Sequence, residues 1–169
     1  MKDWTSYFFD GIPWIASKSK DPNTKVGCII TNQDHSIVAT GYNGFPRGVY
    51  DDTERYEDRD IKLQLVVHAE LNAIAYAAKH GVPLDNTTLY IDWVPCQNCM
   101  KAIIQAGITK IYINGDSPQF NNKELFQRWR SSIAWSLQMA NEADLTLIVR
   151  FNGSFIPLTS ITTIEGLLK

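Results

Sequence analysis

The sequence predicts a single α/β layered domain, and three observations lead to that fold class. Segments of helical periodicity alternate with short β-rich apolar runs between residues 65 and 151, an order typical of helices packed on a sheet with parallel strand pairs. The chain has 169 residues, which suits one domain of ordinary size. Hydrophobic residues make up 44% of it, which is enough to bury a core.

The first part of the chain predicts a helix followed by a β-hairpin. Aromatic and aliphatic side chains recur at helical spacing over residues 4–19, although Gly11 and Pro13 should distort the middle of that helix. Residues 26–30 and 37–42 are short β-rich runs separated by a polar turn, so we expect them to pair as a hairpin.

The middle of the chain predicts a long loop and then a buried helix. Residues 43–60 hold two glycines, a proline and a mixed-charge run without apolar periodicity, so we expect a surface loop of a length that is often functional. Residues 65–80 are small and apolar almost all round, and Gly81 and Pro83 follow as a stop signal. A buried helix is therefore expected over 65–80.

The last part of the chain predicts strands and helices in alternation. The expected strands span 87–93, 110–114 and 145–151, and the expected helices span 96–106 and 125–141. Trp129 and Trp135 in the last helix could serve the core or an interface, and their spacing does not choose between the two. From residue 152 onward we expect a short C-terminal tail.

The charge balance argues against nucleic-acid and membrane partners. Sixteen Lys and Arg residues against 18 Asp and Glu residues give a formal charge of −2, without the basic excess usual in nucleic-acid binders, so a small substrate is favoured. No apolar run is long enough for a transmembrane helix. The N-terminus lacks a secretory signal and three cysteines cannot all pair, so the expected location is the cytoplasm, a host's if the protein is viral.

The strongest chemical signal is an H-x-E segment followed by P-C-x-x-C. His68, Cys96 and Cys99 supply one imidazole and two thiolates, a ligand set that suits zinc and leaves the fourth tetrahedral position for water. Cys96 and Cys99 share one face at the start of a predicted helix, whose N-terminus stabilises their thiolate forms. Glu70, near a helix N-terminus, can flank the metal and reach what the metal holds.

The other candidate ligands have simpler explanations. Cys28 lies in an apolar strand, where a small buried thiol is common. His80 ends a helix, where a cation complements the dipole, and His35 sits in a turn. Residues 43–60 contain neither Cys nor His for a second metal, so we predict a single zinc ion.

H-x-E with P-C-x-x-C is a known signature of zinc-dependent deaminases. The wider sequence resembles the deoxycytidylate (dCMP) deaminase family, of the phage and bacterial type, from about residue 4 to residue 151. Four segments carry the resemblance in order and spacing: DPNTKVGC at 21–28, GYNGFPRG at 41–48, HAELNAI at 68–74 and PCQNC at 95–99. The first two segments distinguish this family from other deaminases with the same zinc ligands.

The resemblance implies the cytidine deaminase-like α/β/α fold with a five-stranded mixed sheet. It implies a deaminase domain over residues 1–151 and a C-terminal tail over 152–169. The implied reaction converts dCMP and water to dUMP and ammonia, which supplies thymidylate synthesis. Zinc held by the three ligands activates the water, and Glu70 moves protons to N3 of the base and to the leaving amine. By similarity, Asn23 contacts the sugar and the Ala69 backbone meets the pyrimidine edge.

The resemblance also implies candidates for the phosphate contacts and for regulation. Thr24, Lys25 or Asn43 would contribute near the 5′-phosphate, because a buried dianion needs a partner. Members of the family are commonly homohexamers that are activated by dCTP and inhibited by dTTP, with Mg²⁺ accompanying the triphosphate. The effector-site candidates are Lys20, Asn43, Gly44, Arg47, Gly48, Tyr76 and Lys79. Some relatives have Phe and Arg where this chain has Tyr76 and Lys79, and a Lys cannot reproduce the Arg fork.

Several other functions stay open from the sequence. Within the deaminases, the rivals are a bifunctional dCMP/dCTP enzyme, a nucleoside cytidine deaminase, a guanine or riboflavin-pathway deaminase and a tRNA adenosine deaminase. A non-catalytic, zinc-stabilised nucleotide-binding module is a rival of another class, but it has no need of an open metal position. A redox C-x-x-C protein leaves His68 and Glu70 unexplained.

Overall fold

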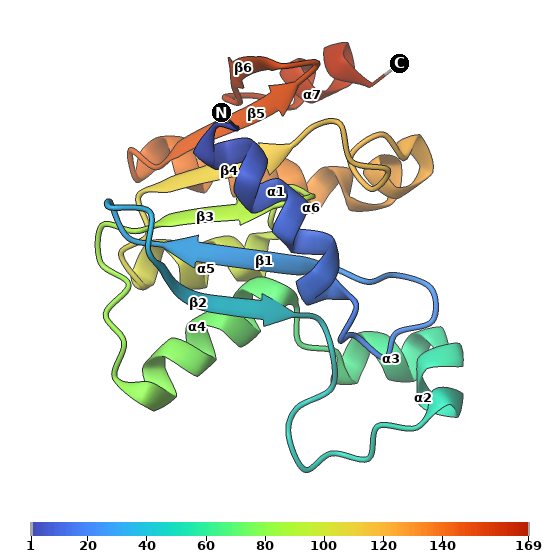
Figure 1. The fold of residues 1–169 in the computed structure, drawn as a ribbon. Helices are drawn as coiled ribbons and strands as arrows, with labels where there is room; N and C mark the ends of the chain where they lie inside the picture. The colour runs from blue at the N-terminus through green and yellow to red at the C-terminus, as the bar shows by residue number, and fades with distance from the viewer. Residues whose placement is uncertain (1, 169) are drawn as a thin grey trace.

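Six strands form one mixed sheet in the computed structural model, which describes residues 2–168 (Figure 1). The strand order is β2-β1-β3-β4-β5-β6. The pairs β3/β4 and β4/β5 are parallel, and the other three pairs are antiparallel. The strands are β1 (Gly27–Thr31), β2 (Ile37–Tyr42), β3 (Thr88–Ile91), β4 (Lys110–Asn114), β5 (Thr146–Phe151) and β6 (Ser154–Pro157).

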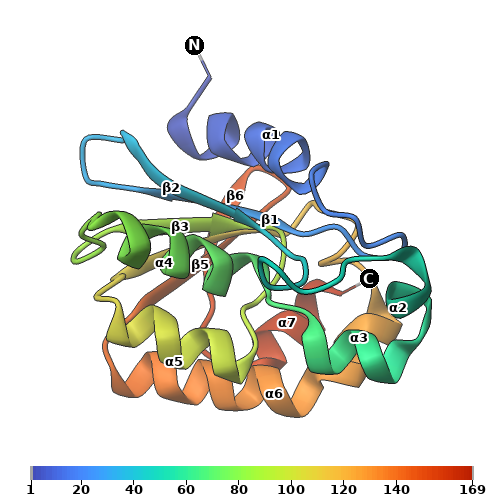
Figure 2. The same ribbon diagram turned by 90° about the horizontal axis from the view of Figure 1, so that it is seen from below.

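Helices cover both faces of the sheet, so the predicted α/β/α layering is confirmed (Figure 2). Helix α1 (Trp4–Ala16) packs against β1, β2 and β3 on one face. Helices α4 (Ala69–His80), α5 (Gln97–Gln105) and α6 (Lys123–Glu142) lie on the other face. The helices α5 and α6 are the crossovers that join the parallel strands, as the alternating pattern predicted.

Helix α1 is continuous and ends at Ala16, so Gly11 and Pro13 do not break it and the predicted end at residue 19 was wrong. Phe8 and Ile12 are buried on the sheet, and that apolar contact holds the helix on the sheet while exposed Pro13 withholds one backbone hydrogen bond. The hairpin of β1 and β2 is confirmed.

The connection from β2 to α4 is more ordered than the sequence predicted. The expected loop over 43–60 contains α2 (Thr53–Glu57), and α3 (Arg59–Leu65) follows directly. The predicted helix over 65–80 begins only at Ala69, because Val67 is extended and forms a β-bridge with Gly44. Helix α2 was missed because it is short and has one buried residue, Tyr56, so its sequence shows no helical period of apolar residues.

Gly41 in β2 allows the sheet and α4 to approach closely. A Cβ atom at this position would lie 2.1 Å from the carbonyl oxygen of Ala69 and 2.7 Å from the backbone nitrogen of Ala73. Only glycine fits there without moving the helix. This contact brings the N-terminus of α4, which carries the H-x-E segment, against the sheet.

The C-terminal segment extends the sheet and its covering layer. Residues 152–169, expected as a tail, contribute β6 beside β5 and α7 (Ile161–Leu167) beside α6 as far as residue 168. The sheet therefore has six strands where five were expected. Buried Leu158 and Ile164 join the main core. No helix among residues 2–168 is long and apolar enough to cross a membrane.

Candidate active site

Two helix N-termini bring the three predicted zinc ligands together. His68 is the residue before α4, Cys96 is the residue before α5, and Cys99 lies in the first turn of α5. The ligand atoms all lie within 4.8 Å of one another. His68 Nδ1 is 3.4 Å from Cys96 Sγ and 3.5 Å from Cys99 Sγ.

These distances fit a tetrahedral zinc ion. Zinc bonds of about 2.3 Å to sulfur and about 2.05 Å to nitrogen, at the tetrahedral angle, place N and S about 3.6 Å apart. The N to S distances of 3.4 and 3.5 Å are close to this value before any metal is bound. The three side chains can therefore hold zinc with little movement, and they leave one coordination position to a non-protein ligand.

The two cysteines shift each other's pKa in opposite directions. The neighbouring Cys99 thiol, helped by His68 and opposed by burial, lowers the pKa of Cys96 to about 4. The Cys96 sulfur, together with burial, raises the pKa of the Cys99 thiol. The two thiols therefore deprotonate unequally without a metal, and a bound cation favours the thiolate form of both.

Contacts from α6 support the turn that carries Cys96. The backbone N–H of Gln97 donates to Ser132 Oγ at 3.0 Å, and Ser136 Oγ donates to the Pro95 carbonyl at 2.8 Å. The Trp129 ring meets the His68 ring edge-on, with 6.0 Å between centroids. Trp129 therefore belongs to the site, which the sequence left open between core and interface.

Glu70 lies in the first turn of α4, beside the ligand cluster. Its side chain is buried, with 4% exposure. Burial raises the pKa of Glu70, and the nearby His68 opposes that shift. A buried carboxyl group with a raised pKa can both accept and return a proton near neutral pH.

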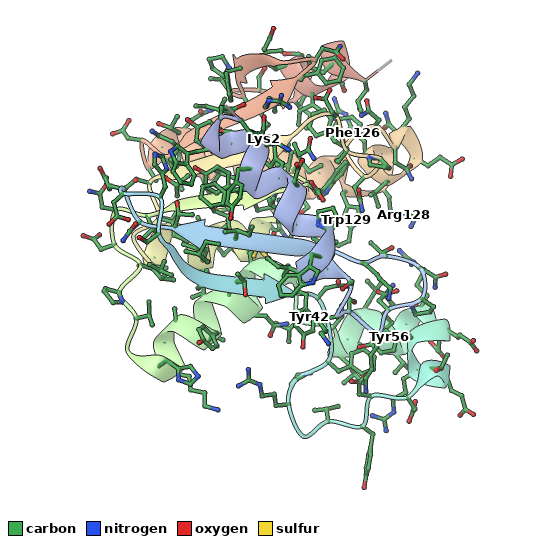
Figure 3. All side chains as sticks on the ribbon, in the orientation of Figure 1. Lys2, Tyr42, Tyr56, Phe126, Arg128 and Trp129 are labelled. Carbon is green, nitrogen blue, oxygen red and sulfur yellow. The ribbon has the colours of Figure 1, made fainter. Side chains whose placement is uncertain are left out.

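A cavity of about 450 Å³ opens beside this cluster. We call the inner end, formed by the buried residues Ala69 and Glu70 and the half-buried residues His68 and Cys96, the floor of the cavity. We call the outer end, formed by the exposed residues Glu57, Arg59 and Arg128 and the half-buried Leu125, the mouth. In Figure 3, Arg128 and Trp129 lie together on α6, and Tyr56 lies across from them on α2. The size is in the range of sites for small molecules.

A buried ion pair holds one wall of the cavity. Asp21 is fully buried, and its Oδ2 atom lies 2.6 Å from Nζ of Lys62 on α3. The Lys62 side chain is 15% exposed. Asp21 Oδ1 also accepts from the backbone N–H groups of Asn23 (2.9 Å) and Thr24 (3.0 Å). These bonds fix the turn of the DPNT segment against α3.

The predicted substrate residues fall into two groups. Asn23, Thr24, Asn43 and Ala69 line the cavity, but Lys25 is exposed and is not among the lining residues. The amide of Asn43 is already occupied, because it accepts from Val26 N–H at 2.8 Å and donates to the Thr24 carbonyl at 2.8 Å. Asn43 therefore holds the cavity wall in shape through these hydrogen bonds.

The predicted effector residues other than Asn43 lie outside this cavity. Lys20 pairs with Asp51 at 2.9 Å, and Gly44 bonds to Val67 through both backbone groups. Gly48 has a φ angle of +83°, which suits glycine. Arg47 is exposed in the connection after β2, whereas Tyr76 and Lys79 are exposed on α4.

The sequence did not identify Arg59, Lys62 and Arg128 as cavity residues. Arg59 and Lys62 lie in a mixed-charge stretch with no visible period, and Arg128 lies in a helix that shows only an amphipathic pattern. Their shared surroundings come from the packing of α3 and α6 around the cavity. The remaining candidates behave as predicted: Cys28 is a fully buried core residue, and His35 stacks on Trp4 in the β1–β2 turn.

Helix N-termini that gather one His and two Cys around a point, with a glutamate two residues after the His, define a zinc-dependent deaminase. The chain belongs to the family described as "Cytidine and deoxycytidylate deaminase zinc-binding region", which it matches over residues 2–114. The resemblance predicted from the four sequence segments is thereby confirmed, and so is the prediction of a deaminase.

Individual relatives agree with this family. An uncharacterized deaminase encoded in the luxG 3′ region of Aliivibrio fischeri is 36% identical over 143 residues, which cover 85% of this chain and 90% of that protein. Human deoxycytidylate deaminase is 40% identical over 119 residues, 68% of this chain and 66% of the human protein. The chain thus spans about two thirds of the length of that enzyme.

A solved relative shows the same fold. The crystal structure of dCMP deaminase from cyanophage S-TIM5 in apo form matches with a TM-score of 0.57 and 30% identity, over 68% of this chain and 85% of that one. The structure of the same enzyme in complex with dCMP and dUMP matches with a TM-score of 0.55 and 28% identity, over 68% and 83%.

Proposed function

We propose that this protein catalyses the hydrolytic deamination of dCMP to dUMP and ammonia, which supplies dUMP for thymidylate synthesis. The observation that carries the proposal is a buried glutamate beside an open three-ligand zinc site at the floor of a cavity that fits a small molecule. The choice of dCMP follows the relatives named deoxycytidylate deaminase and the cyanophage enzyme that binds dCMP and dUMP.

The proposed mechanism assigns each proton movement to Glu70. When bound by His68, Cys96 and Cys99, zinc supplies Lewis acidity, which lowers the pKa of a coordinated water. Glu70 accepts one proton from the attacking water and delivers it to N3 of the base. It then accepts the proton of the new C4 hydroxyl and delivers it to the amine, which leaves as ammonia when the C4–N bond breaks and the C4 carbonyl forms. Its burial favours this role because a carboxyl with a raised pKa returns protons readily.

Other groups of the chain orient the substrate in this proposal. The Ala69 backbone lies at the floor and meets the pyrimidine edge, while Asn23, on the wall, contacts the sugar. The Asn23 side chain has no hydrogen-bond partner among residues 2–168, so its amide is available to a ligand. The Asp21 carboxylate bonded to its backbone N–H keeps it in place.

Regulation and assembly are further parts of the proposal. We propose activation by dCTP and inhibition by dTTP, with Mg²⁺ on the triphosphate, in a cytoplasmic homohexamer. Apart from Asn43, the effector candidates on the β2–α2 connection and on α4 lie outside the catalytic cavity, and we propose that a neighbouring subunit completes their site. The division into a deaminase domain over 1–151 and a tail over 152–169 also stays a prediction.

The experiment is ammonia release from dCMP, deoxycytidine, cytidine and dCTP by the zinc-loaded protein. We expect the highest kcat/KM with dCMP, and sigmoidal dCMP kinetics that become hyperbolic with dCTP and are suppressed by dTTP. Equal turnover of dCTP would establish the bifunctional enzyme instead. Zinc binding without ammonia release from any substrate would favour the non-catalytic module, and kinetics indifferent to both triphosphates would remove the regulatory part.

A further inference from the structure

Two helices from distant parts of the chain face the same cavity with the same kind of surface. Each presents basic and apolar side chains together at a spacing of three and four residues, which places them on one helix face. On α3 these are Arg59, Lys62 and Leu63, and on α6 they are Leu125, Arg128 and Trp129.

The burial of the lining residues gives the cavity a direction. Glu70 is buried and the ligand cluster beside it is buried or half-buried, whereas Arg59 and Arg128 are exposed at the mouth. A ligand whose reacting ring reaches Glu70 therefore directs its opposite end toward the two arginines. In a nucleotide, the end opposite the base is the 5′-phosphate.

The charges at the mouth leave two cations uncompensated. The Lys62 ammonium is paired with Asp21, whereas Arg59 and Arg128 form no ion pair with any residue of the described chain, 2–168. Glu57 also lines the mouth, within 4.0 Å of neither arginine. Guanidinium groups are charged at every physiological pH and bind phosphate oxygens through paired N–H donors.

We propose that Arg59 and Arg128 form a clamp on the 5′-phosphate and make the enzyme specific for a cytosine nucleotide over the nucleoside. This inference rests on the proposed function and adds to it the residues that select the phosphate. It replaces Lys25, which lies outside the cavity lining, and Asn43, whose amide is occupied, as the phosphate contacts. Arg128 lies beyond residue 114, where the family match ends, so α6 would set part of the specificity.

The test compares two substrates in matched variants of the full-length, zinc-loaded protein. Steady-state kcat/KM is measured with dCMP and with deoxycytidine, which lacks the phosphate, for Arg59→Gln, Arg128→Gln and the double variant. Arg130→Gln is the control, because Arg130 lies on the same helix, is exposed, pairs with Glu165 and does not line the cavity.

Each single substitution should lower kcat/KM for dCMP by about 10- to 100-fold, mainly through KM, and change that for deoxycytidine by less than about threefold. Arg128→Lys should recover only part of the loss, because the ammonium keeps the charge and not the fork. The control should keep the wild-type ratio of the two substrates. Parallel losses for both substrates, or an unchanged preference for dCMP in the double variant, would overturn the clamp.

Failure of the clamp and failure of the proposed function give different results. A wild-type protein that releases no ammonia from dCMP contradicts the function, and the clamp is then judged by calorimetric binding of dCMP to the same variants. Weaker dCMP binding by the arginine variants, with unchanged binding by Arg130→Gln, would still support the clamp. Equal affinities in all variants, or no dCMP binding by the wild type, would overturn it.

Discussion

The floor and the mouth of the cavity differ in how their functional groups are held. At the floor, His68, Cys96 and Cys99 touch one another on two helix N-termini, and Glu70 is buried beside them. At the mouth, Arg59 and Arg128 are exposed on two separate helices without ion-pair partners in the chain from 2 to 168. If the proposed function and clamp hold, close packing preorganises the groups that carry the chemistry, whereas exposed side chains select the phosphate.

The largest effect is expected from Glu70→Gln, which removes the proposed acid-base group at the floor of the cavity. The amide keeps the shape of the side chain but cannot move protons, so kcat for dCMP should fall by about 10²- to 10⁴-fold. Zinc content, measured by plasma mass spectrometry, should stay at one ion per chain because the ligands are untouched. Glu124→Gln, an exposed first-turn residue of α6, is the control. Substantial turnover by Glu70→Gln would contradict the proposed mechanism.

The second prediction concerns the wall between floor and mouth. Lys62→Met leaves the fully buried Asp21 carboxylate without its cation, so the free energy of unfolding should fall by about 3 kcal/mol. Asp21→Asn together with Lys62→Met removes both charges and keeps an acceptor for the two backbone N–H groups, so most of that loss should be recovered.

Urea unfolding of the zinc-loaded proteins checks the wall. If the double variant is no more stable than Lys62→Met alone, the ion pair is not what holds the DPNT turn. Deoxycytidine turnover is a second measurement on the same variants. We expect turnover by the double variant to be closer to the wild-type value than turnover by Lys62→Met.

The third prediction concerns Asp92, a buried residue directly after β3, whose effect reaches its full size only above pH 6. Burial raises the pKa of Asp92 to about 6, although Asn114 Nδ2 donates to it at 2.9 Å. The folded state therefore binds the proton more tightly than the unfolded state, whose pKa is about 3.9. The stability linked to this group is present at low pH and is lost as the pH rises from about 4 through 6.

Asp92→Asn should abolish the loss of stability at higher pH, because an amide carries no charge, and it should keep the hydrogen bond from Asn114. Its gain in unfolding free energy should be as much as about 3 kcal/mol at pH 7.5 and roughly half as large at pH 5. Urea unfolding of both proteins at the two pH values is the measurement, and the variant is compared with the wild type at each pH so that zinc effects cancel. A gain that is the same at both values would show that Asp92 does not titrate in this window.

Local patterns predicted the floor and much of the fold. His68 and Cys96 each lie at a helix N-terminus, where the backbone itself directs side chains toward a shared point, so a motif of a few residues carries the geometry. The strands β4 and β5 and the helix α6 follow from periodicity because they are long or apolar enough to show it.

Where the prediction failed, local sequence carries too little information. Helix α2 has five residues and is held by its N-cap Asp52 and by Tyr56 stacked on Phe45, a contact eleven residues apart. Strand β6 exists because β5 offers it a partner. Short elements with few apolar residues are stabilised by tertiary contacts and do not form alone.

The sequence by itself determined the fold class, because the alternation of helices and strands is visible along the chain, and it predicted the zinc ligands and the acid-base residue from two short motifs. Only the tertiary structure decided which cations meet at the mouth. Arg59 and Arg128 are 69 positions apart. In sequence, the helix faces that carry them cannot be distinguished from ordinary solvent-exposed faces. Their shared cavity arises from packing around the sheet, and packing depends on the whole chain.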